Sequence, residues 1–409
     1  MKARFARSAI LLAAVLVACS GADSTPSPAT TLPPVATLPP PATATPPETP
    51  ATTAAPTIDH TPRPAPTDAE LAPRLQNLLD EWLTTAGTPG AVLGVRLTDG
   101  RTAIVASGWR DTEGDDPVEP TDRFRVGSIT KTLVAAVVLG LAADELIDLD
   151  ADLATYLPDA PHADEVTIRQ LLGHTSGMPD VFLLSEYQTA ILISPGRVWD
   201  PAGVLGLVSD PPLDFEPGTD WAYSNTNYLL LGMVAEEVTG DPLARLLRER
   251  VSAPLGLTDT YLEELEPGPP VPVAGHHDLD GDGIPDSLAG IPYTALVTSG
   301  AAAGGLSSTA LDVLDFADGL FGGDLLSEEA LAEMLTPTAH YPAYGLGIGR
   351  LVTDAGEAWG HTGALPGFST VFARSHEDGG TIVVLANRSA TDVEALAREV
   401  ASLVADEAG

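Results

Sequence analysis

The sequence predicts an α/β plus α fold, in which an antiparallel sheet is flanked by helices and a helical subdomain is inserted between the strands of that sheet. Two observations predict it. Strand-like runs lie near both ends of the folded part of the chain, each followed or preceded by an amphipathic helix, and the long stretch between them is mostly helical and interrupted by Pro and Gly. One core can include both sets of strands only if the two ends of the chain build the same sheet.

The first helix is the clearest of the expected elements. Leu71, Leu75, Leu78, Leu79 and Trp82 recur at helical spacing, so one face of this segment is apolar. In chain order the remaining elements are expected as strands at 90–97 and 102–109 about a turn at 98–100, a mostly helical stretch at 128–254, helices at 309–321 and 327–335, strands at 345–352, 368–374 and 381–386, and a last helix at 391–404.

The chain is expected to divide into three parts. Residues 1–19 have a basic start, an apolar stretch and the end Leu16-Val17-Ala18-Cys19, which resembles a bacterial lipoprotein signal in which Cys19 becomes the lipidated N-terminus. Residues 20–67 are rich in Pro, Thr and Ala and are expected to be a disordered linker, because they cannot bury enough apolar surface to fold. Residues 68–409 form the globular domain, with the helical subdomain at about 128–290. The protein is thus predicted to be exported and anchored by its lipid to the membrane, on the extracytoplasmic side of a bacterial cell envelope.

The composition excludes several classes of protein. Lys and Arg number 20 against 57 Asp and Glu, which gives a formal net charge of −37 and argues against nucleic acid as a partner. The chain has one Cys, so it can form neither an internal disulfide nor a Cys-rich metal site. Lysine occurs only at Lys2 and Lys131, and Lys2 lies in the expected leader. A chain that uses Arg almost everywhere else keeps one Lys, and Lys differs from Arg in that it can lose its proton when buried.

A first candidate motif contains this lysine. Ser128 and Lys131 are three residues apart at the start of an apolar helix, so their side chains lie on one face of its first turn. The uncommitted N–H groups and the positive dipole of a helix N-terminus favour an oxyanion and lower the pKa of a lysine. A neutral Lys131 could then take the hydroxyl proton of Ser128 and activate it for acyl transfer. The structural alternative is that Ser128 caps the helix and Lys131 is a surface charge.

Two further motifs are weak when taken alone. Tyr223 and Asn225 precede a helical run, where a Tyr hydroxyl near a Lys can relay a proton and an Asn amide can hold a carbonyl; Tyr223 could equally be core and Asn225 a helix cap. His361, Thr362 and Gly363 lie between strand-like segments, where the backbone N–H groups of a strand edge could complete an oxyanion hole. A histidine in such a place is more often structural.

Together the three motifs resemble, in order and spacing, the signatures of the serine β-lactamase-like / penicillin-binding superfamily, which are S-x-x-K, Y-x-N and K-T-G or H-T-G. The similarity extends to the segments at 146–150, 156–158, 166–177, 216–218 and 344–347 and covers about residues 68–405. It is closest to the class C β-lactamase and D-alanyl-D-alanine carboxypeptidase branch. The resemblance implies the β-lactamase/transpeptidase-like fold, with the site between an α/β and an α subdomain.

The resemblance also implies a role for each residue. Ser128 would be the nucleophile, Lys131 the base and Tyr223 the proton shuttle, while Asn225 would bind the substrate amide. His361, Thr362 and Gly363 would line the site, and the N–H groups of Ser128 and Ala364 would form the oxyanion hole. His174 and Ser176 belong to a further family hallmark and are interpreted as structural. The chemistry would require no metal or organic cofactor.

The acyl substrate is less well defined by the sequence. A D-alanyl-D-alanine carboxypeptidase acting on peptidoglycan stem peptides is the expected function, and it must bind a free carboxylate, which calls for a cation beside the third motif. Arg350 is the candidate, although adjacent strand positions face opposite sides and it could point away. A β-lactam, an ester or a D-amino-acid peptide stays an alternative substrate, and a non-catalytic penicillin-binding sensor is the alternative from another class.

One acidic loop predicts a separate metal site. Asp278, Asp280, Asp282 and Asp286 alternate with Gly283 at the sixth position, which matches the ligand spacing of calcium loops. The twelfth position is Ala289, so one acidic ligand is missing, and an acidic turn without a metal is an equally good interpretation. Calcium there would be structural and would take no part in acyl transfer.

Overall fold

The computed structural model describes residues 63–408 except 209–210, 354–355 and 377–378. The predicted signal peptide, Cys19 and most of the predicted linker lie outside the described residues. No helix in the described part of the chain is both long and apolar enough to cross a membrane.

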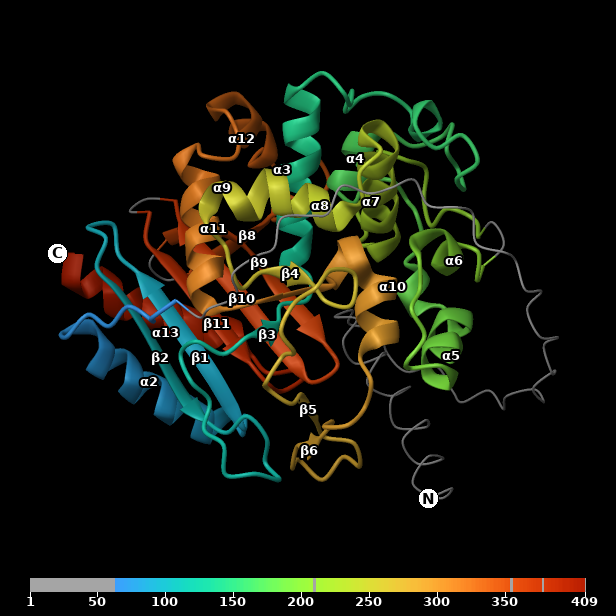
Figure 1. Ribbon diagram of the computed structural model, residues 1–409. Helices are drawn as coiled ribbons and strands as arrows, with labels where there is room; N and C mark the ends of the chain where they lie inside the picture. The colour runs from blue at the N-terminus through green and yellow to red at the C-terminus, as the bar shows by residue number, and fades with distance from the viewer. Residues whose placement is uncertain (1–62, 209–210, 354–355, 377–378, 409) are drawn as a thin grey trace.

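A six-stranded antiparallel sheet forms the centre of the α/β part, as predicted (Figure 1). Its order is β2-β1-β11-β10-β9-β8, so the first two strands pair with the last one and both ends of the chain build one sheet. The strands are β1 (Gly90–Arg96), β2 (Thr102–Gly108), β8 (Gly349–Thr353), β9 (Gly356–Leu365), β10 (Phe368–Ser375) and β11 (Thr381–Ala386).

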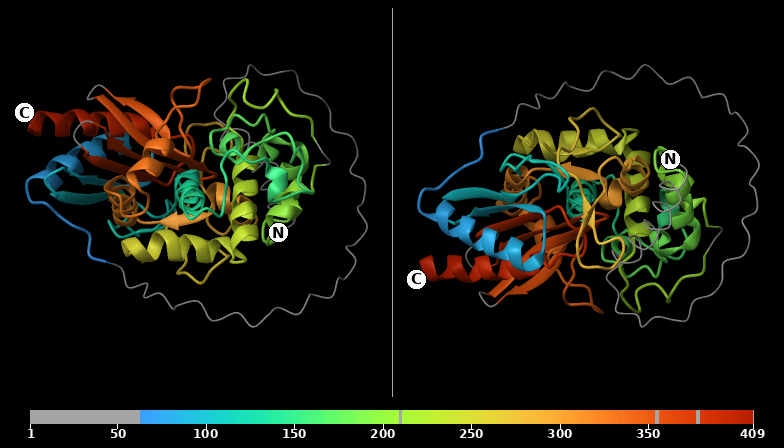
Figure 2. Two further views of the ribbon diagram at one scale, coloured as in Figure 1. Left: turned by 90° about the horizontal axis from the view of Figure 1, so that it is seen from above. Right: turned by 90° about the horizontal axis from the view of Figure 1, so that it is seen from below.

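Helices cover both faces of this sheet (Figure 2). On one face, α2 (Leu71–Ala86) packs on β2 and α13 (Val393–Ala408) packs on β10 and β11. On the other face lie α11 (Ala310–Gly322) and the start of α3 (Ile129–Ala143). The apolar stripe of α2 predicted from the sequence is the face it buries, since Leu71, Leu75 and Leu79 are fully buried.

The inserted helical part packs against the far side of α3, which therefore runs through the middle of the molecule (Figure 1). Its helices are α4 (Ile168–Leu172), α5 (Ser185–Ile193), α6 (Pro201–Leu205), α7 (Asn225–Thr239), α8 (Leu243–Leu247), α9 (Ala253–Leu255), α10 (Thr294–Gly304) and α12 (Glu328–Met334), with 3₁₀ turns at Leu153–Thr155 and Val181–Leu183 and a π-helical turn at Arg248–Ser252. Small sheets join the two parts: β3 (Phe124–Arg125), β7 (Leu306–Ser308) and β4 (Tyr261–Leu262) form one, and β5 (His276–His277) and β6 (Asp286–Ser287) form a hairpin.

Three sequence predictions need correction. The domain begins a few residues before the predicted start at 68, because Thr67 already pairs with Ala103 and Arg63 forms an ion pair with Asp312 (2.6 Å). The segment around His361, expected between strands, is β9, the longest strand described. Helix α10 was not expected at all. Its residues are small, so it has the weak helical pattern of a helix that is buried on all sides.

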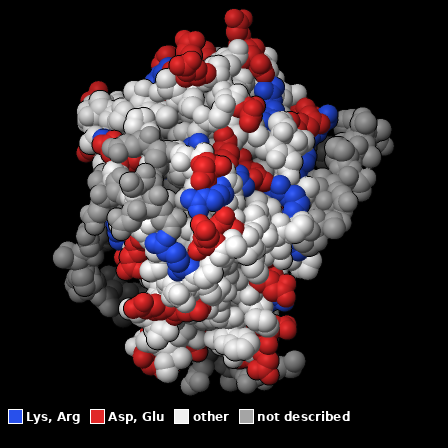
Figure 3. All heavy atoms as spheres, turned by 90° about the vertical axis from the view of Figure 1, so that its left-hand side faces the viewer, with Lys and Arg blue, Asp and Glu red and all other residues white. Residues whose placement is uncertain are grey.

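Acidic and basic side chains are interspersed on the face shown in Figure 3. Arg96, for example, pairs with both Asp315 (2.9 Å) and Asp318 (2.5 Å). Much of the positive charge of the chain is therefore used to bridge acidic groups within the fold.

Candidate active site

Ser128 immediately precedes the buried helix α3. The Val126 N–H donates to the Leu306 carbonyl (3.0 Å), which holds the chain in place just before the helix. Ser128 is partly exposed, whereas every residue from Ile129 to Leu139 is buried. The Ser128 side chain makes no capping hydrogen bond, so capping is not its role. A hydroxyl that solvent can reach thus lies at the end of a fully buried helix.

Lys131 is fully buried, so the alternative of a surface charge is wrong. Its Nζ contacts three acceptors: Ser128 Oγ (3.0 Å), Asn225 Oδ1 (2.8 Å) and the Ala303 carbonyl oxygen (2.6 Å). Burial lowers the pKa of Lys131 to about 7, and the charge of Asp180 opposes that change. A large share of the lysine is therefore neutral near pH 7 and within reach of the Ser128 hydroxyl.

Asn225 connects the lysine to the half-buried carboxylate of Asp180. It is the first residue of α7, and its Nδ2 donates to Asp180 Oδ2 (2.7 Å) while its Oδ1 accepts from Lys131. Asp180 Oδ1 also accepts from the Phe182 N–H (2.9 Å). Burial raises the pKa of Asp180, and these N–H donors oppose that change. One hydrogen of the Asn225 amide is thus already committed, which leaves the other for a substrate carbonyl.

Tyr223 lies over the same lysine. Its ring centroid is 4.8 Å from Lys131 Nζ, and its buried hydroxyl lies near the Ser128 hydroxyl without forming a hydrogen bond of good geometry to any described residue. Burial raises the pKa of Tyr223 well above its ordinary value, with the Ser128 hydroxyl opposing the rise. Tyr223 therefore stays a protonated phenol at neutral pH and can act as a proton donor, which leaves Lys131 as the group suited to be the base.

His174 and Ser176 lie beneath this layer. The fully buried His174 ring is 4.4 Å from that of Tyr223, and its Nδ1 accepts from the Ser224 N–H (3.2 Å). Ser176 Oγ donates to Asn227 Oδ1 (2.8 Å). His174 packs against the Tyr223 ring, and both His174 and Ser176 hydrogen-bond to residues at the start of α7. Neither side chain hydrogen-bonds to Ser128 in the described part of the chain. Their positions agree with the structural interpretation made from the sequence.

His361 lies on β9 opposite the helix end and is neutral. Its Nε2 accepts from the Tyr344 hydroxyl (3.0 Å) and its Nδ1 donates to the Thr362 carbonyl oxygen (2.6 Å). Burial, helped by the charge of Lys131, lowers the pKa of His361 to about 3. The third motif therefore contributes a neutral ring rather than a cation.

The backbone of β9 comes very close to the start of α3. Gly127 has φ +54°, and a Cβ on it would lie 2.8 Å from Ala364 N; a Cβ on Gly363 would lie 2.0 Å from the Val126 carbonyl oxygen. Only glycine permits both approaches. The Ala364 N–H is thereby placed beside the turn that carries the Ser128 N–H, which is one of the helix-start groups without an intrahelical acceptor. These two N–H groups are suitably placed to stabilise an oxyanion.

Replacing Gly127 by Ala tests this approach. We expect kcat for ester hydrolysis to fall about 10²-fold or more, because displacing β9 removes one oxyanion donor. Gly256→Ala is the matched control, since Gly256 also has a positive φ of +66° but nothing lies within 4 Å of its added Cβ. Gly256→Ala should lose about 1 kcal/mol of stability from backbone strain. Gly127→Ala should lose more, because its Cβ also clashes with the Ala364 backbone, and only Gly127→Ala should lose activity. Equal activity in the two variants would contradict the role of Ala364.

Among the described side-chain hydrogen bonds, Arg350 contacts Glu357 and none of the other predicted site residues. Arg350 lies on β8 and is paired with Trp359 of β9, which comes two residues before His361. Its guanidinium pairs with Glu357 (Nε to Oε2, 2.9 Å). In this register the Arg350 side chain lies on the same face of the sheet as His361, and its guanidinium pairs with the carboxylate on the neighbouring strand. Substrate binding by Arg350 stays a prediction.

Three groups of the site were missed by the sequence analysis: Asp180, Tyr344 and the carbonyl of Ala303. Asp180 lies three residues after Gly177, the end of a family-like segment, and its nearness to that segment could have indicated it. Tyr344 lies in another family-like segment. Ala303 acts through its backbone, where α10 is kinked at Ala301, and such a contact leaves no signal in the side-chain sequence.

The predicted calcium loop is the connection between β5 and β6. Single carboxylate oxygens of Asp278, Asp280 and Asp282 lie within 4.8 Å of one another, and these side chains are half-buried or exposed. Asp286 instead accepts from the Leu279 N–H (3.0 Å). Three of the four predicted ligands are thus brought together, and calcium binding stays a prediction.

Adding calcium to chelator-treated protein should raise its melting temperature if the loop binds the ion, because a ligand that binds only the folded state stabilises it. The shift should disappear in Asp280→Asn and persist in Asp116→Asn, a surface control outside the loop. An unchanged melting temperature of the original chain, with and without calcium, would refute the metal site.

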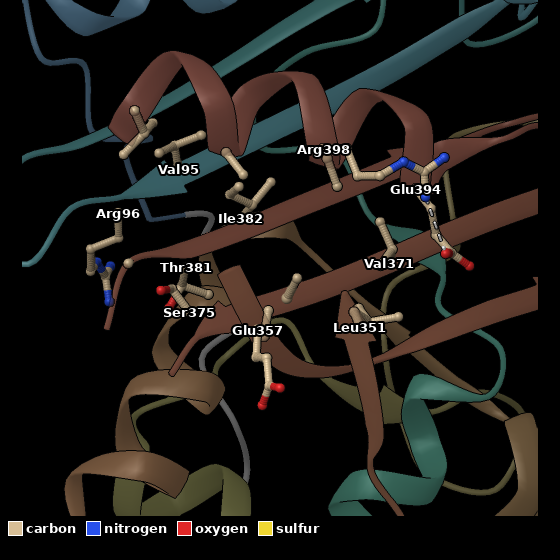
Figure 4. A pocket seen from close by; sticks show the side chains of 16 residues that line it. Val95, Arg96, Leu351, Glu357, Val371, Ser375, Thr381, Ile382, Glu394 and Arg398 are labelled. Carbon is tan, nitrogen blue, oxygen red and sulfur yellow. Dashed lines mark ion pairs between the residues drawn. The ribbon is translucent and has the colours of Figure 1, made fainter. Parts of the chain in front are cut away.

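A separate hollow lies under α13, on the other face of the sheet (Figure 4). It is lined mainly by aliphatic side chains of α13 and the strands, with the ion pair of Arg398 and Glu394 on its rim (3.6 Å). No residue of the three motifs lines it. The residues that line this hollow are therefore separate from the residues of the three motifs.

Comparison with known proteins agrees with this geometry. Residues 75–406 match the family model described as Beta-lactamase. Among the relatives, a putative penicillin-binding protein PbpX of Bacillus subtilis is 26% identical, with 75% of this chain and 72% of that protein covered. Esterase EstB of Burkholderia gladioli is 35% identical over 49% of this chain and 53% of its own.

A solved structure gives the same fold. The crystal structure of D-amino acid amidase from Ochrobactrum anthropi SV3, complexed with L-phenylalanine, superposes with a TM-score of 0.73 at 27% identity and covers 82% of this chain and 99% of that one. The antiparallel sheet flanked by helices and the inserted helical subdomain are thus the β-lactamase/transpeptidase fold. With its three motifs assembled at one end of α3 and the family model matched over most of its described length, the chain belongs to the beta-lactamase family, in the superfamily of serine β-lactamases and penicillin-binding proteins.

Proposed function

We propose that the protein is a serine acyl hydrolase for esters and amides whose leaving group carries no free carboxylate, including D-amino-acid amides, and that it acts through an acyl-enzyme on Ser128. The observation that carries the proposal is the contact of the Ser128 hydroxyl with the buried Lys131 amine (3.0 Å). His361 is neutral, and Arg350 is paired with Glu357.

The chain's own residues would perform the reaction in two steps. Lys131 accepts the proton of the Ser128 hydroxyl as Oγ attacks the acyl carbonyl, and the N–H groups of Ser128 and Ala364 stabilise the oxyanion. The Tyr223 phenol donates a proton to the departing alcohol or amine and is reprotonated from Lys131. Water then enters with Lys131 again as the base, and the acid is released from Ser128.

The substrate class follows from the charges. A free carboxylate next to the scissile bond needs a cation or a set of strong donors where it binds. The side chains that the third motif itself offers to such a carboxylate are the neutral His361 ring and the partly exposed Thr362. An uncharged leaving group requires no such partner. The amidase that shares this fold and the related esterase have names that fit this class of substrate.

The D-alanyl-D-alanine carboxypeptidase expected from the sequence is the second candidate. It is supported by the likeness to PbpX. Thr362 could donate one hydrogen bond to a terminal carboxylate, but a guanidinium partner would require Arg350 to leave Glu357. Attachment to a membrane through Cys19, on the outer side of the cell, likewise stays a proposal that depends on residues 16–19.

Mass spectrometry of residues 63–409 during turnover separates these functions. The chain is incubated in turn with p-nitrophenyl butyrate, D-phenylalanine amide, a D-alanyl-D-alanine peptide and benzylpenicillin, beside Ser128→Ala. We expect hydrolysis of the ester and the amide, lost in Ser128→Ala and unchanged in Arg350→Ala. Release of D-alanine that depends on Arg350 would instead establish the carboxypeptidase, and a stable penicillin adduct on Ser128 would support a penicillin-binding peptidase. No turnover of any of the four would refute a hydrolase acting on these classes.

A further inference from the structure

The three hydrogen-bond partners of the Lys131 amine differ in whether they can donate, and the three motifs do not explain this difference. Of its three partners, the Ala303 carbonyl and the Asn225 Oδ1 can only accept, whereas the Ser128 hydroxyl can either accept or donate. A neutral lysine has two hydrogens and one lone pair. The two acceptors take the hydrogens, so the lone pair is directed at the Ser128 hydroxyl.

This direction depends on which end of the Asn225 amide faces the lysine. The oxygen and nitrogen of an amide have almost the same shape, and only their partners decide the orientation. If the amide were reversed, its NH₂ would face Lys131 and would compete with Ser128 for the lone pair. The partner on the other side of the amide is Asp180, 2.7 Å from Nδ2.

We propose that Asp180 is a positioning residue, which by accepting from the Asn225 amide nitrogen turns the amide oxygen toward Lys131 and so directs the lysine lone pair to the Ser128 hydroxyl. The inference rests on the proposed function, because it concerns the activation of the same serine. Asp180 is suited to this role because it can only accept while it is ionised. Burial raises the pKa of Asp180, and the Phe182 N–H on Oδ1, the side-chain and backbone N–H groups of Asn225 and the charge of Lys131 oppose that rise and favour the ionised carboxylate.

Asp180 is held in place independently of Lys131. It is the N-cap of the 3₁₀ turn Val181–Leu183, and the neighbouring Val181 N–H donates to Thr226 Oγ1 (2.9 Å), which ties this turn to α7. Asp180 and Asn225 are therefore fixed relative to each other by the backbone on both sides. The carboxylate is part of the permanent structure of the site and does not require a substrate to order it.

The charge of Asp180 also predicts a change in pH dependence. The groups that face Lys131 are Asp180 before the 3₁₀ turn, His174 after α4, Tyr223 and Tyr228 at the start of α7 and His361 on β9. Among them Asp180 is the one that favours the charged lysine. Removing its charge should lower the pKa of Lys131 further and shift the acid limb of the activity profile to lower pH.

The test compares Asp180→Asn with Asp312→Asn. Asp312 is the control, because it is an Asp of α11 that is even more buried than the half-buried Asp180, and it too accepts from a backbone N–H (Asp259, 2.8 Å). Two rates are measured between pH 5 and 9: phosphonylation of Ser128 by a fluorophosphonate reagent, and hydrolysis of p-nitrophenyl butyrate. The first needs an activated serine but no particular substrate.

We expect Asp180→Asn to slow both reactions about 10- to 100-fold at their plateau, with KM for the ester within about twofold and the acid limb moved to lower pH. Asp312→Asn should lose stability, but the acid limb of its pH–activity profile should lie at the same pH as in the original chain. An unchanged plateau and limb in Asp180→Asn would overturn the inference. A raised KM for D-phenylalanine amide alone, with normal labelling, would also overturn it and make Asp180 a ligand of the substrate ammonium.

The two proposals fail in different ways. If Ser128 is phosphonylated but no ester or amide is hydrolysed, the proposed substrate class is wrong, and the labelling profile of Asp180→Asn still decides the positioning role. If the original chain is not phosphonylated at any pH, Ser128 is not activated and the positioning role of Asp180 is refuted with it.

Discussion

Replacing Lys131 by Arg is expected to lower the rate of Ser128 acylation by about 10³-fold or more. A guanidinium stays protonated at any pH at which the protein folds, so it cannot take the hydroxyl proton, and a positioned general base typically contributes a factor of about 10² to 10⁴. The measurement is the rate of the acyl adduct on Ser128 by mass spectrometry, with p-nitrophenyl butyrate in the first turnover.

The buried position of Lys131 requires a second variant as control. The side chain is fully buried, so the larger Arg should cost about 1 to 3 kcal/mol of stability by overpacking. Lys131→Met keeps approximately the original volume and removes the base without adding a charge. Both variants should be folded by circular dichroism and equally slow. Acylation at the original rate in either folded variant would refute the assignment of Lys131 as base.

The second large effect is on the pH dependence of activity and stability. Because the neutral amine is the base and the pKa of Lys131 is lowered to about 7, kcat/KM should fall as the pH falls through about 7. In the unfolded chain a lysine has a pKa of about 10.4. Between these values the unfolded state binds a proton that the folded state does not, so the free energy of unfolding should rise with pH by up to about 1.4 kcal/mol per unit.

Urea unfolding of the original chain and of Lys131→Met, at intervals from pH 7 to 10, isolates this contribution. All other titrating groups are common to the two proteins, so the difference between their unfolding free energies should increase in favour of the original chain as the pH rises. The variant also leaves two buried acceptors, Asn225 Oδ1 and the Ala303 carbonyl, without the donor. That cost lowers the free energy of unfolding of Lys131→Met by the same amount at every pH, so it does not change how the difference between the two proteins varies with pH. Parallel curves would show that Lys131 is charged in the folded state.

Much of the fold could be predicted from local patterns. The apolar spacing of Leu71, Leu75 and Leu79 predicted α2, and β11 begins and ends where its apolar run does, at Thr381 and Ala386. These elements are amphipathic or uniformly apolar, and their period is visible without knowledge of their partners. Helix α10 escaped prediction because its buried small residues have no polar face to mark a period.

The candidate site divides in the same way. Ser128, Lys131, Tyr223, Asn225 and His361 could be selected from the sequence because their side chains and spacing carry the motifs, and the structure brings all five together. The occurrence of a single lysine, Lys131, beyond the predicted leader was itself a signal. Arg350 was selected by position on a strand, but which acceptor a long flexible side chain reaches depends on its neighbours in the sheet.

The charge of each group in the site, and the partner to which each group points, were decided by the tertiary structure alone. Lys131 loses water only because partners 94 and 172 residues away in the sequence, Asn225 and Ala303, close over it. The same enclosure makes His361 neutral and Tyr223 a phenol. The sequence by itself determined which chemical groups are present and on which elements they lie. Whether each group is charged, and toward which partner it points, follows from burial and hydrogen bonding between distant segments, since both act through space and not along the chain.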